Sequence, residues 1–157
     1  MISEELKEKY SSDDADSINA IIKDLRPLLS MLLISFKENI PATIFSKDVG
    51  ALEALCRYMK ENLGMNYHEI AVALSRNDRT VWTACNKAIK KQRELPPVKK
   101  TSIMLPVKIF QNRKLTVLEA AIIHLKNGGM RYSKIGELLH RDQRNIWTIY
   151  SRAKNKK

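Results

Sequence analysis

An internal repeat of about 65 residues constrains the fold of this chain more than any other feature of its sequence. The segment GMNYHEIAVALSRNDRTVWTACNKAIKK begins at Gly64 and returns as GMRYSKIGELLHRDQRNIWTIYSRAKNKK from Gly129. The match continues upstream, where IPATIF at residues 40–45 corresponds to LPVKIF at residues 105–110. Units of this size are just large enough for a helical core, so we expect two small domains. Their predicted boundaries are 40–91 and 105–157.

The chain before the repeat falls into two parts. Residues 1–16 are polar and acidic, a composition that predicts a mobile leader. Residues 17–39 carry apolar side chains at three- and four-residue spacing, which predicts an amphipathic helical segment. Asp16 or Ser17 is the expected N-cap of this helix. We expect Pro27 to kink or restart it, because proline has no amide donor.

The apolar surface of this helical segment continues almost all the way round the helix beyond Pro27. So much apolar surface must be covered by other protein. Two interpretations remain open: the segment packs on the first repeat and completes its core, or it forms the interface of a homodimer.

A linker is predicted between the two domains, over residues 92–104. This stretch holds a Pro96-Pro97 pair and shows no periodicity. Fully extended, it reaches at most about 40 Å, which is comparable with one turn of B-DNA. The two domains could therefore lie on neighbouring major grooves of one duplex.

Positive charge is concentrated in the repeated part of the chain. Residues 1–40 carry five basic and eight acidic side chains, whereas residues 41–157 carry 23 basic and nine acidic ones. Such an asymmetry favours a polyanionic partner for the repeats. The alternative is that the excess only keeps a small protein in solution.

Each repeat unit has the spacing of three helices. In the first unit an apolar stripe over residues 49–63 predicts a support helix. Lys47 or Asp48 stands at its expected start and Gly64 beyond its end. A second, short helix is expected over residues 67–74, followed by a tight turn.

The third helix of each unit begins after a good capping residue, Asn77 in the first unit and Asp142 in the second. Small residues, Ala71 and Gly136, stand where two helices must approach each other closely. The residues expected to face inward are Val81, Cys85 and Ala88 in the first unit and Ile146, Tyr150 and Ala153 in the second.

The opposite face of each third helix is polar and rich in hydrogen-bond donors. A helix of this length fits the major groove of DNA, where arginine pairs with guanine and asparagine or glutamine with adenine. We expect Arg79 and Arg144 to be the main base readers; a merely solvated helix face is the alternative. The predicted DNA-binding residues are Arg76, Asp78, Arg79, Thr80, Thr83, Asn86, Lys87, Lys90, Arg141, Gln143, Arg144, Asn145, Thr148, Ser151 and Arg152.

The run YHEIAVALSRNDRTVWTACNKAIKK resembles the helix-turn-helix of the sigma-factor domain that reads the minus-35 promoter element. It is also similar to the DNA-binding domain of the quorum-sensing regulators. The resemblance implies two tandem tri- or four-helical helix-turn-helix domains whose third helices enter the major groove. A complete sigma factor is not expected, because the chain has no room for its other regions. The matching positions are Tyr67, Glu69-Ile70-Ala71, Leu74, Thr80-Val81 and Lys87-Ala88 in the first unit, and Lys134-Ile135-Gly136, Leu139, Asn145-Ile146 and Arg152-Ala153 in the second.

Trp82 and Trp147 are the only tryptophans, and they stand where this family usually has a basic or polar residue. We expect them to pack against the support helix or the other unit. The alternative is that they stack on sugars and thymine methyl groups of DNA.

The sequence carries no pattern typical of an enzyme. It has no paired carboxylates, glycine-rich phosphate loop or metal-ligand spacing, so we expect no catalysis, no cofactor and no metal site. Cys56 and Cys85 correspond to Ile122 and Tyr150 in the second unit, which predicts that both thiols are reduced core residues.

These patterns favour an all-α, cytoplasmic protein that associates with the nucleoid when it is bound to DNA. No segment resembles a signal peptide, and no apolar run is long enough to span a bilayer. We expect a sequence-specific binder of double-stranded DNA, a transcriptional regulator with two recognition helices in adjacent major grooves. The alternatives are an interaction module that docks on RNA polymerase or another regulator, and a binder of structured RNA.

Overall fold

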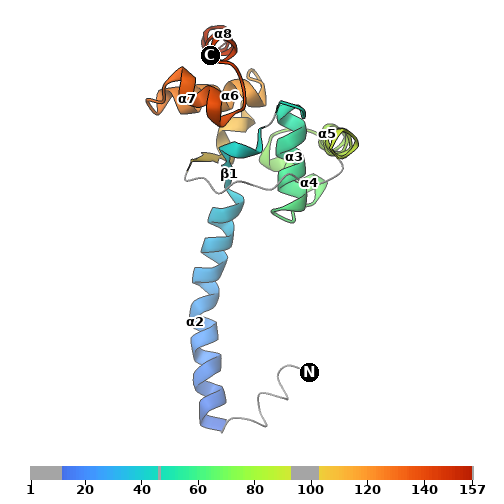
Figure 1. Cartoon of the computed structure of the whole chain (residues 1–157). Coiled ribbons are helices and arrows are strands. Elements are labelled where there is room, and N and C mark those ends of the chain that lie inside the picture. Colours follow the sequence, from blue (N-terminus) through green and yellow to red (C-terminus); the bar gives the residue numbers. More distant parts are fainter. Residues whose placement is uncertain (1–11, 46, 93–102, 157) are drawn as a thin grey trace. The chain divides into compact units, whose positions relative to one another are not determined.

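Two units make up the structure, a computed structural model of the whole chain (Figure 1). The described residues are 12–45, 47–92 and 103–156. The first unit is Met1–Phe36 and the second is Lys37–Lys157. Residues 1–11 of the predicted leader and residues 93–102 of the predicted linker lie outside the described residues.

α2 (Ser12–Lys37) is a single helix of 26 residues. It already includes Asp16 and Ser17, so the expectation that one of them caps the helix is wrong. The helix also does not restart at Pro27, because proline removes one intrahelical hydrogen bond and leaves the rest of the ladder intact. Whether the first repeat or a second protomer covers its apolar side chains stays a prediction. Those that are exposed are Ile18, Ile21, Ile22, Leu25, Leu28 and Leu29.

The second unit contains both repeats, which we call copy 1 (residues 39–92) and copy 2 (residues 103–156). Copy 1 consists of β1 (Asn39–Pro41), the 3-10 helix η1 (Ala42–Ile44), α3 (Ala51–Glu61), α4 (Tyr67–Ala73) and α5 (Asp78–Lys91). Copy 2 consists of β2 (Met104–Pro106), the 3-10 helix η2 (Val107–Gln111), α6 (Val117–Asn127), α7 (Tyr132–Leu138) and α8 (Gln143–Lys154). The predicted all-α fold class is confirmed; the described residues add one short two-stranded sheet that was not expected.

β1 and β2 are equivalent strands of the two copies and pair with each other. The pairing is antiparallel and places Ile40 opposite Leu105, which is its counterpart in the repeat. Segments that pair antiparallel about equivalent residues are related by a two-fold rotation. The rings of Phe45 and Phe110, which are also equivalent, lie with their centroids 6.1 Å apart. The strands and the aromatic pair therefore meet about a local pseudo-two-fold axis.

One hydrophobic core extends through both copies. α3 contacts α6 directly, and two side chains of copy 2 donate hydrogen bonds to copy 1. Gln111 Nε2 donates to the carbonyl of Ala73 over 3.0 Å, and the Arg113 guanidinium donates to the carbonyl of Ser75 over 2.9 Å. The relative orientation of the copies is therefore set by packing and does not depend on the length of the linker.

The starts of the third helices follow the predicted caps. The side chain of Asn77 accepts a hydrogen bond from the amide of Thr80 over 2.7 Å. In copy 2 the carboxylate of Asp142 accepts from the amide of Arg144 over 2.7 Å. Both caps satisfy amides that have no partner within the helix.

The support helices begin where a glutamate of the first turn reaches back to the chain before the helix. In copy 1 the amide of Gly50 donates to Glu53 over 3.1 Å, so α3 starts two or three residues later than the sequence suggested. In copy 2 the amide of Thr116 donates to Glu119 over 2.9 Å. This return bond fixes the helix start in both copies.

Candidate nucleic-acid interface

The turn between the second and third helices has the same backbone conformation in both copies. Ser75 and His140 have φ angles of 51° and 52°, in the left-handed region that non-glycine residues seldom adopt. The amides of Arg76 and Arg141, one residue later, each donate to a carbonyl of the second helix over 2.8 Å. The direction in which the third helix leaves the turn is therefore the same in each copy.

The inner faces of α5 and α8 carry the residues that were predicted to pack inward. Ala84 and Ile149, which follow Val81 and Ile146 by three residues, are also buried there, although the sequence analysis did not predict it. Because the inner face is filled, the opposite face of each helix remains for solvent or a partner. The buried residues are Val81, Cys85 and Ala88 in α5 and Ile146 and Ala153 in α8, whereas Tyr150 is half-buried.

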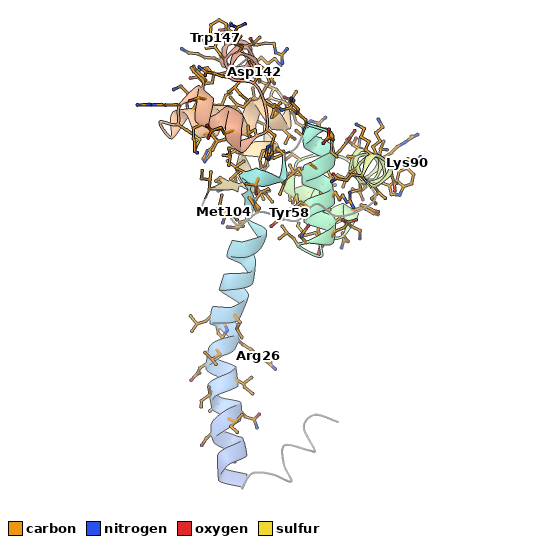
Figure 2. The ribbon with its side chains drawn as sticks, in the orientation of Figure 1. Arg26, Tyr58, Lys90, Met104, Asp142 and Trp147 are labelled. Atoms are coloured by element: carbon orange, nitrogen blue, oxygen red, sulfur yellow. The ribbon has the colours of Figure 1, made fainter. Side chains whose placement is uncertain are left out.

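The predicted DNA-binding residues lie on the outer faces and flanks of these helices and in the two turns. In Figure 1 both α5 and α8 are seen end-on at the edge of the second unit, and Figure 2 shows Lys90 on the outer side of α5. The exposed members are Asp78, Arg79, Lys87, Lys90, Gln143, Arg144, Asn145, Thr148 and Arg152. The half-buried members are Arg76, Thr80, Thr83, Asn86, Arg141 and Ser151.

Arg79 and Arg144 occupy equivalent places near the start of the third helices, and both are exposed. Within the described parts of the chain, neither guanidinium has a hydrogen bond or an ion pair. The threonine one turn later donates its hydroxyl to the arginine carbonyl, from Thr83 over 2.7 Å and from Thr148 over 2.9 Å. Each hydroxyl oxygen therefore keeps its capacity to accept a hydrogen bond.

A glutamate of each support helix holds the end of the third helix. Glu53 accepts a hydrogen bond from Lys91 over 2.8 Å. Glu119 is fully buried and accepts from Lys156 over 2.8 Å and from Arg152 over 3.3 Å. Burial alone would raise the pKa of both carboxyl groups, but hydrogen bonds from the lysines and from nearby amides outweigh it and lower both pKa values.

These glutamates were missed in the sequence, although Leu-Glu-Ala stands at the same place in both units. The ion pair also gives Arg152, a predicted DNA contact, a structural role. Its side chain is still 63% exposed, so a phosphate could reach it as well.

A cleft of about 710 Å³ opens between the copies. It is bordered by the first turns of α3 and α6, by one flank of α5 and by the arginines of both turns. Predicted DNA-binding residues of both copies therefore meet in one place, which the sequence did not show. Those that line the cleft are Arg76, Arg79, Thr80, Thr83, Lys87 and Arg141.

The two tryptophans are exposed, by 55% for Trp82 and 56% for Trp147. The expectation that they pack inside the protein is therefore wrong. The preceding residue, Val81 or Ile146, fills the core, and the next residue on a helix points about 100° away from it. Figure 2 shows Trp147 at the outer edge of α8. A hollow of about 430 Å³ beside it is lined by Tyr132, Gln143, Arg144, Trp147 and Thr148.

Cys56 and Cys85 are buried and unbridged, which confirms their prediction as core residues. A hydrogen bond between the thiols, together with burial, raises the pKa of Cys56. Nowhere among the described residues do three or more His, Cys, Asp or Glu side chains gather as they would around a metal ion. None of the described helices has the length and apolar content needed to cross a membrane. No known protein family, curated protein or solved structure matches the chain.

Proposed function

We propose that the protein binds double-stranded DNA in a sequence-specific way, with α5 and α8 as recognition helices of two helix-turn-helix copies. The observation that carries the proposal is the pair of equivalent outer faces, on which Arg79 and Arg144 are exposed and, among the described residues, unpaired. A guanidinium in such a position can donate two hydrogen bonds to one guanine edge. The protein would then act as a transcriptional regulator in the cytoplasm, on the nucleoid.

The two-fold relation between the copies supports one site that both helices read at once. Duplex DNA has local two-fold axes of its own, and dimeric readers match them with the symmetry of the protein. Here the shared core holds α5 and α8 at fixed positions. We therefore propose two half-sites in neighbouring major grooves, about 34 Å apart along the duplex.

The half-sites should be similar but not identical. The recognition helices share an arginine, Arg79 or Arg144, and a threonine one turn later. Other positions on the outer faces carry different side chains and so favour different bases. These differing pairs are Asp78 and Gln143, and Asn86 and Ser151.

Selection from random duplexes at fixed salt tests this proposal. We expect an enriched sequence with two half-sites that share one base pair and differ beside it. Arg79→Ala should relax base preference in one half-site and Arg144→Ala in the other, at a cost of about 1–3 kcal/mol each. Lys90→Ala is the matched control, because a phosphate contact at the helix end should weaken all sequences alike.

Two results would overturn the proposal. One is a selected pool without any enriched sequence. The other is a pair of arginine variants that keep the parental preference at every position. The affinity must also fall with salt, with a log-log slope of about −0.9 per phosphate contacted.

Docking on another protein is the second candidate, and the exposure of Trp82 and Trp147 favours it. Tryptophan is common at the centre of protein contacts, and RNA polymerase or another transcription protein is the expected class of partner. A docking function predicts that Trp82→Ala and Trp147→Ala abolish binding of that partner and leave DNA affinity unchanged. A loss of DNA affinity in the same variants would instead assign the indoles to the DNA surface.

A further inference from the structure

The cleft between the copies combines features that none of its elements has alone. It has a volume of about 710 Å³ and is lined by residues of both copies. Four of the lining side chains are cationic, and the one carboxylate among them, Glu53, is already engaged by Lys91 and by the amide of Gly50. The cationic side chains are Arg76, Arg79, Lys87 and Arg141. Glu53 also interacts electrostatically with Lys87, but the cleft still carries more positive than negative charge.

The two turn arginines are the strongest sign that an anion is expected here. Arg76 and Arg141 are equivalent in the repeat, and both line the cleft. The Nε atom of each is buried and has no hydrogen-bond partner within the described part of the chain. An unsatisfied buried donor is costly, and the cost is larger when the group is charged. Burial and the neighbouring Arg113 also lower the pKa of Arg76, so the site as it stands disfavours its own positive charge.

The backbone around the cleft adds to this preference. The first turns of α3 and α6 line it through Ala51, Leu52, Val117 and Leu118. Amides in the first turn of a helix point outward without a partner in the helix and favour negative charge. The two helix starts and the two arginines thus surround the same space from both copies.

We propose that the cleft binds a phosphate group between the two copies, held by Arg76 and Arg141. The DNA backbone is the source that the geometry favours, because Arg79, Thr83 and Lys87 carry the flank of the recognition helix α5 into the same cleft. That source rests on the proposed function. The arginines would then hold the DNA backbone between the two half-sites, beside the flank of α5.

Substitution of the turn arginines tests the proposal on the full chain. Arg76→Gln and Arg141→Gln should each lower the affinity for all duplexes alike, by about fivefold to tenfold in 0.1 M salt, and reduce the salt slope by about 0.9. Arg26→Gln, the same change on the exposed surface of α2, is the matched control. The thermal midpoints of the variants should equal or exceed that of the parent, because a partly buried positive charge is gone. If the glutamine variants fail to fold, Arg76→Lys and Arg141→Lys take their place, because lysine keeps the positive charge.

A second arm distinguishes a free phosphate ligand from the DNA backbone. The thermal midpoint of the protein alone is measured in inorganic phosphate and pyrophosphate, and compared with chloride at equal ionic strength. A rise in the parent that the glutamine variants lose, with unchanged DNA binding, would assign the cleft to a free phosphate-bearing ligand.

The proposal is overturned when the arginine variants change neither DNA affinity nor the response to phosphate. If the parent protein binds no DNA, the proposed function is contradicted but the cleft proposal is not. The thermal midpoints in phosphate and chloride still decide whether the cleft binds phosphate.

Discussion

Copy 1 fills the space between its support helix and its third helix with Cys56 and Cys85, whereas copy 2 uses Ile122 and Tyr150 at the same positions. Thiols, an isoleucine and a phenol ring differ in size and shape. Apolar cores accept such exchanges when the neighbouring side chains adjust and the total volume is kept. The interior of each copy is therefore specified by apolar character and volume.

The joint between the copies keeps two identical pairs of residues, beside pairs that differ such as Ile40 and Leu105. Phe45 and Phe110 are the same residue and pack on each other across the axis. Arg76 and Arg141 are likewise the same residue and enter the same cleft. A residue next to the axis contacts its own counterpart, so a change on one side must suit the other side as well. The comparison indicates that these two pairs at the joint are less free to change than the interiors of the copies.

The largest effect should come from the aromatic pair at the joint. Phe110→Ala removes a fully buried ring and should cost about 3–5 kcal/mol, with both copies unfolding in one transition. Urea unfolding followed by circular dichroism measures this. Leu28→Ala on exposed α2 is the control and should stay within about 0.5 kcal/mol of the parent. Copies that behaved as independent domains would show copy 1 unfolding at the parental urea concentration.

The buried glutamate of copy 2 should come next. Glu119→Gln leaves Lys156 and Arg152 without their carboxylate and should cost about 2 kcal/mol at neutral pH. The matched change, Glu53→Gln in copy 1, should cost less because Glu53 is partly exposed and, among the described residues, forms a single ion pair, with Lys91. Equal losses in the two variants would contradict this difference between the copies.

The same glutamate predicts a pH dependence. The folded protein lowers the pKa of Glu119 below its ordinary value of 4.5, so the stabilisation is complete above that value. It is lost as the pH falls through the lowered pKa. The difference in unfolding free energy between the parent and Glu119→Gln should therefore shrink on acidification, and a constant difference down to pH 2 would be the contrary result.

A smaller effect is expected where the second helix meets the turn. A Cβ at Gly136 would lie 2.6 Å from the carbonyl oxygen of Arg141, so Gly136→Ala should cost about 1–2 kcal/mol despite the better helix propensity of alanine. Ala71→Gly in copy 1 tests the counterpart and should cost about 1–2 kcal/mol, through helix propensity and the loss of a buried methyl group. A Gly136→Ala variant more stable than the parent would show that the turn of copy 2 is as open as that of copy 1.

The smallest effect should be a gain at the turn itself. Ser75→Gly and His140→Gly relieve a left-handed conformation and should each stabilise the protein by about 0.5–1 kcal/mol. The two gains should be equal, because the φ angles agree within a degree. Thermal unfolding measures them, and a loss of stability in either variant would mean that its side chain makes a contact worth more than the strain.

Much of each copy could be predicted because its signals are local. The caps at Asn77 and Asp142 and the inward steps along α5 follow from residues within one or two turns. Ala71 and Gly136 were identified as positions of close approach on the same basis. Such patterns depend only on helix geometry, which sequence spacing reports directly.

What escaped prediction depends on contacts between distant segments. β1 and β2 are three residues long and each ends in proline, so neither carries a strand signal of its own. The cleft depends on the packing of the two copies on each other, which brings the turn arginines of both copies together. Trp82 and Trp147 are exposed because the preceding residues, Val81 and Ile146, fill the core. The general tendency of tryptophan to pack against protein therefore led to a wrong prediction.

Binding to duplexes whose selected half-sites are moved apart tests the central claim, that the two copies form one rigid body that reads DNA. Inserting about five base pairs turns one half-site to the opposite face of the duplex. The rigid body predicts that affinity drops to that of a single half-site, by about 100-fold or more, and returns in part when about ten base pairs restore the face. An affinity that is indifferent to the spacing would mean that the copies read DNA as separately tethered domains.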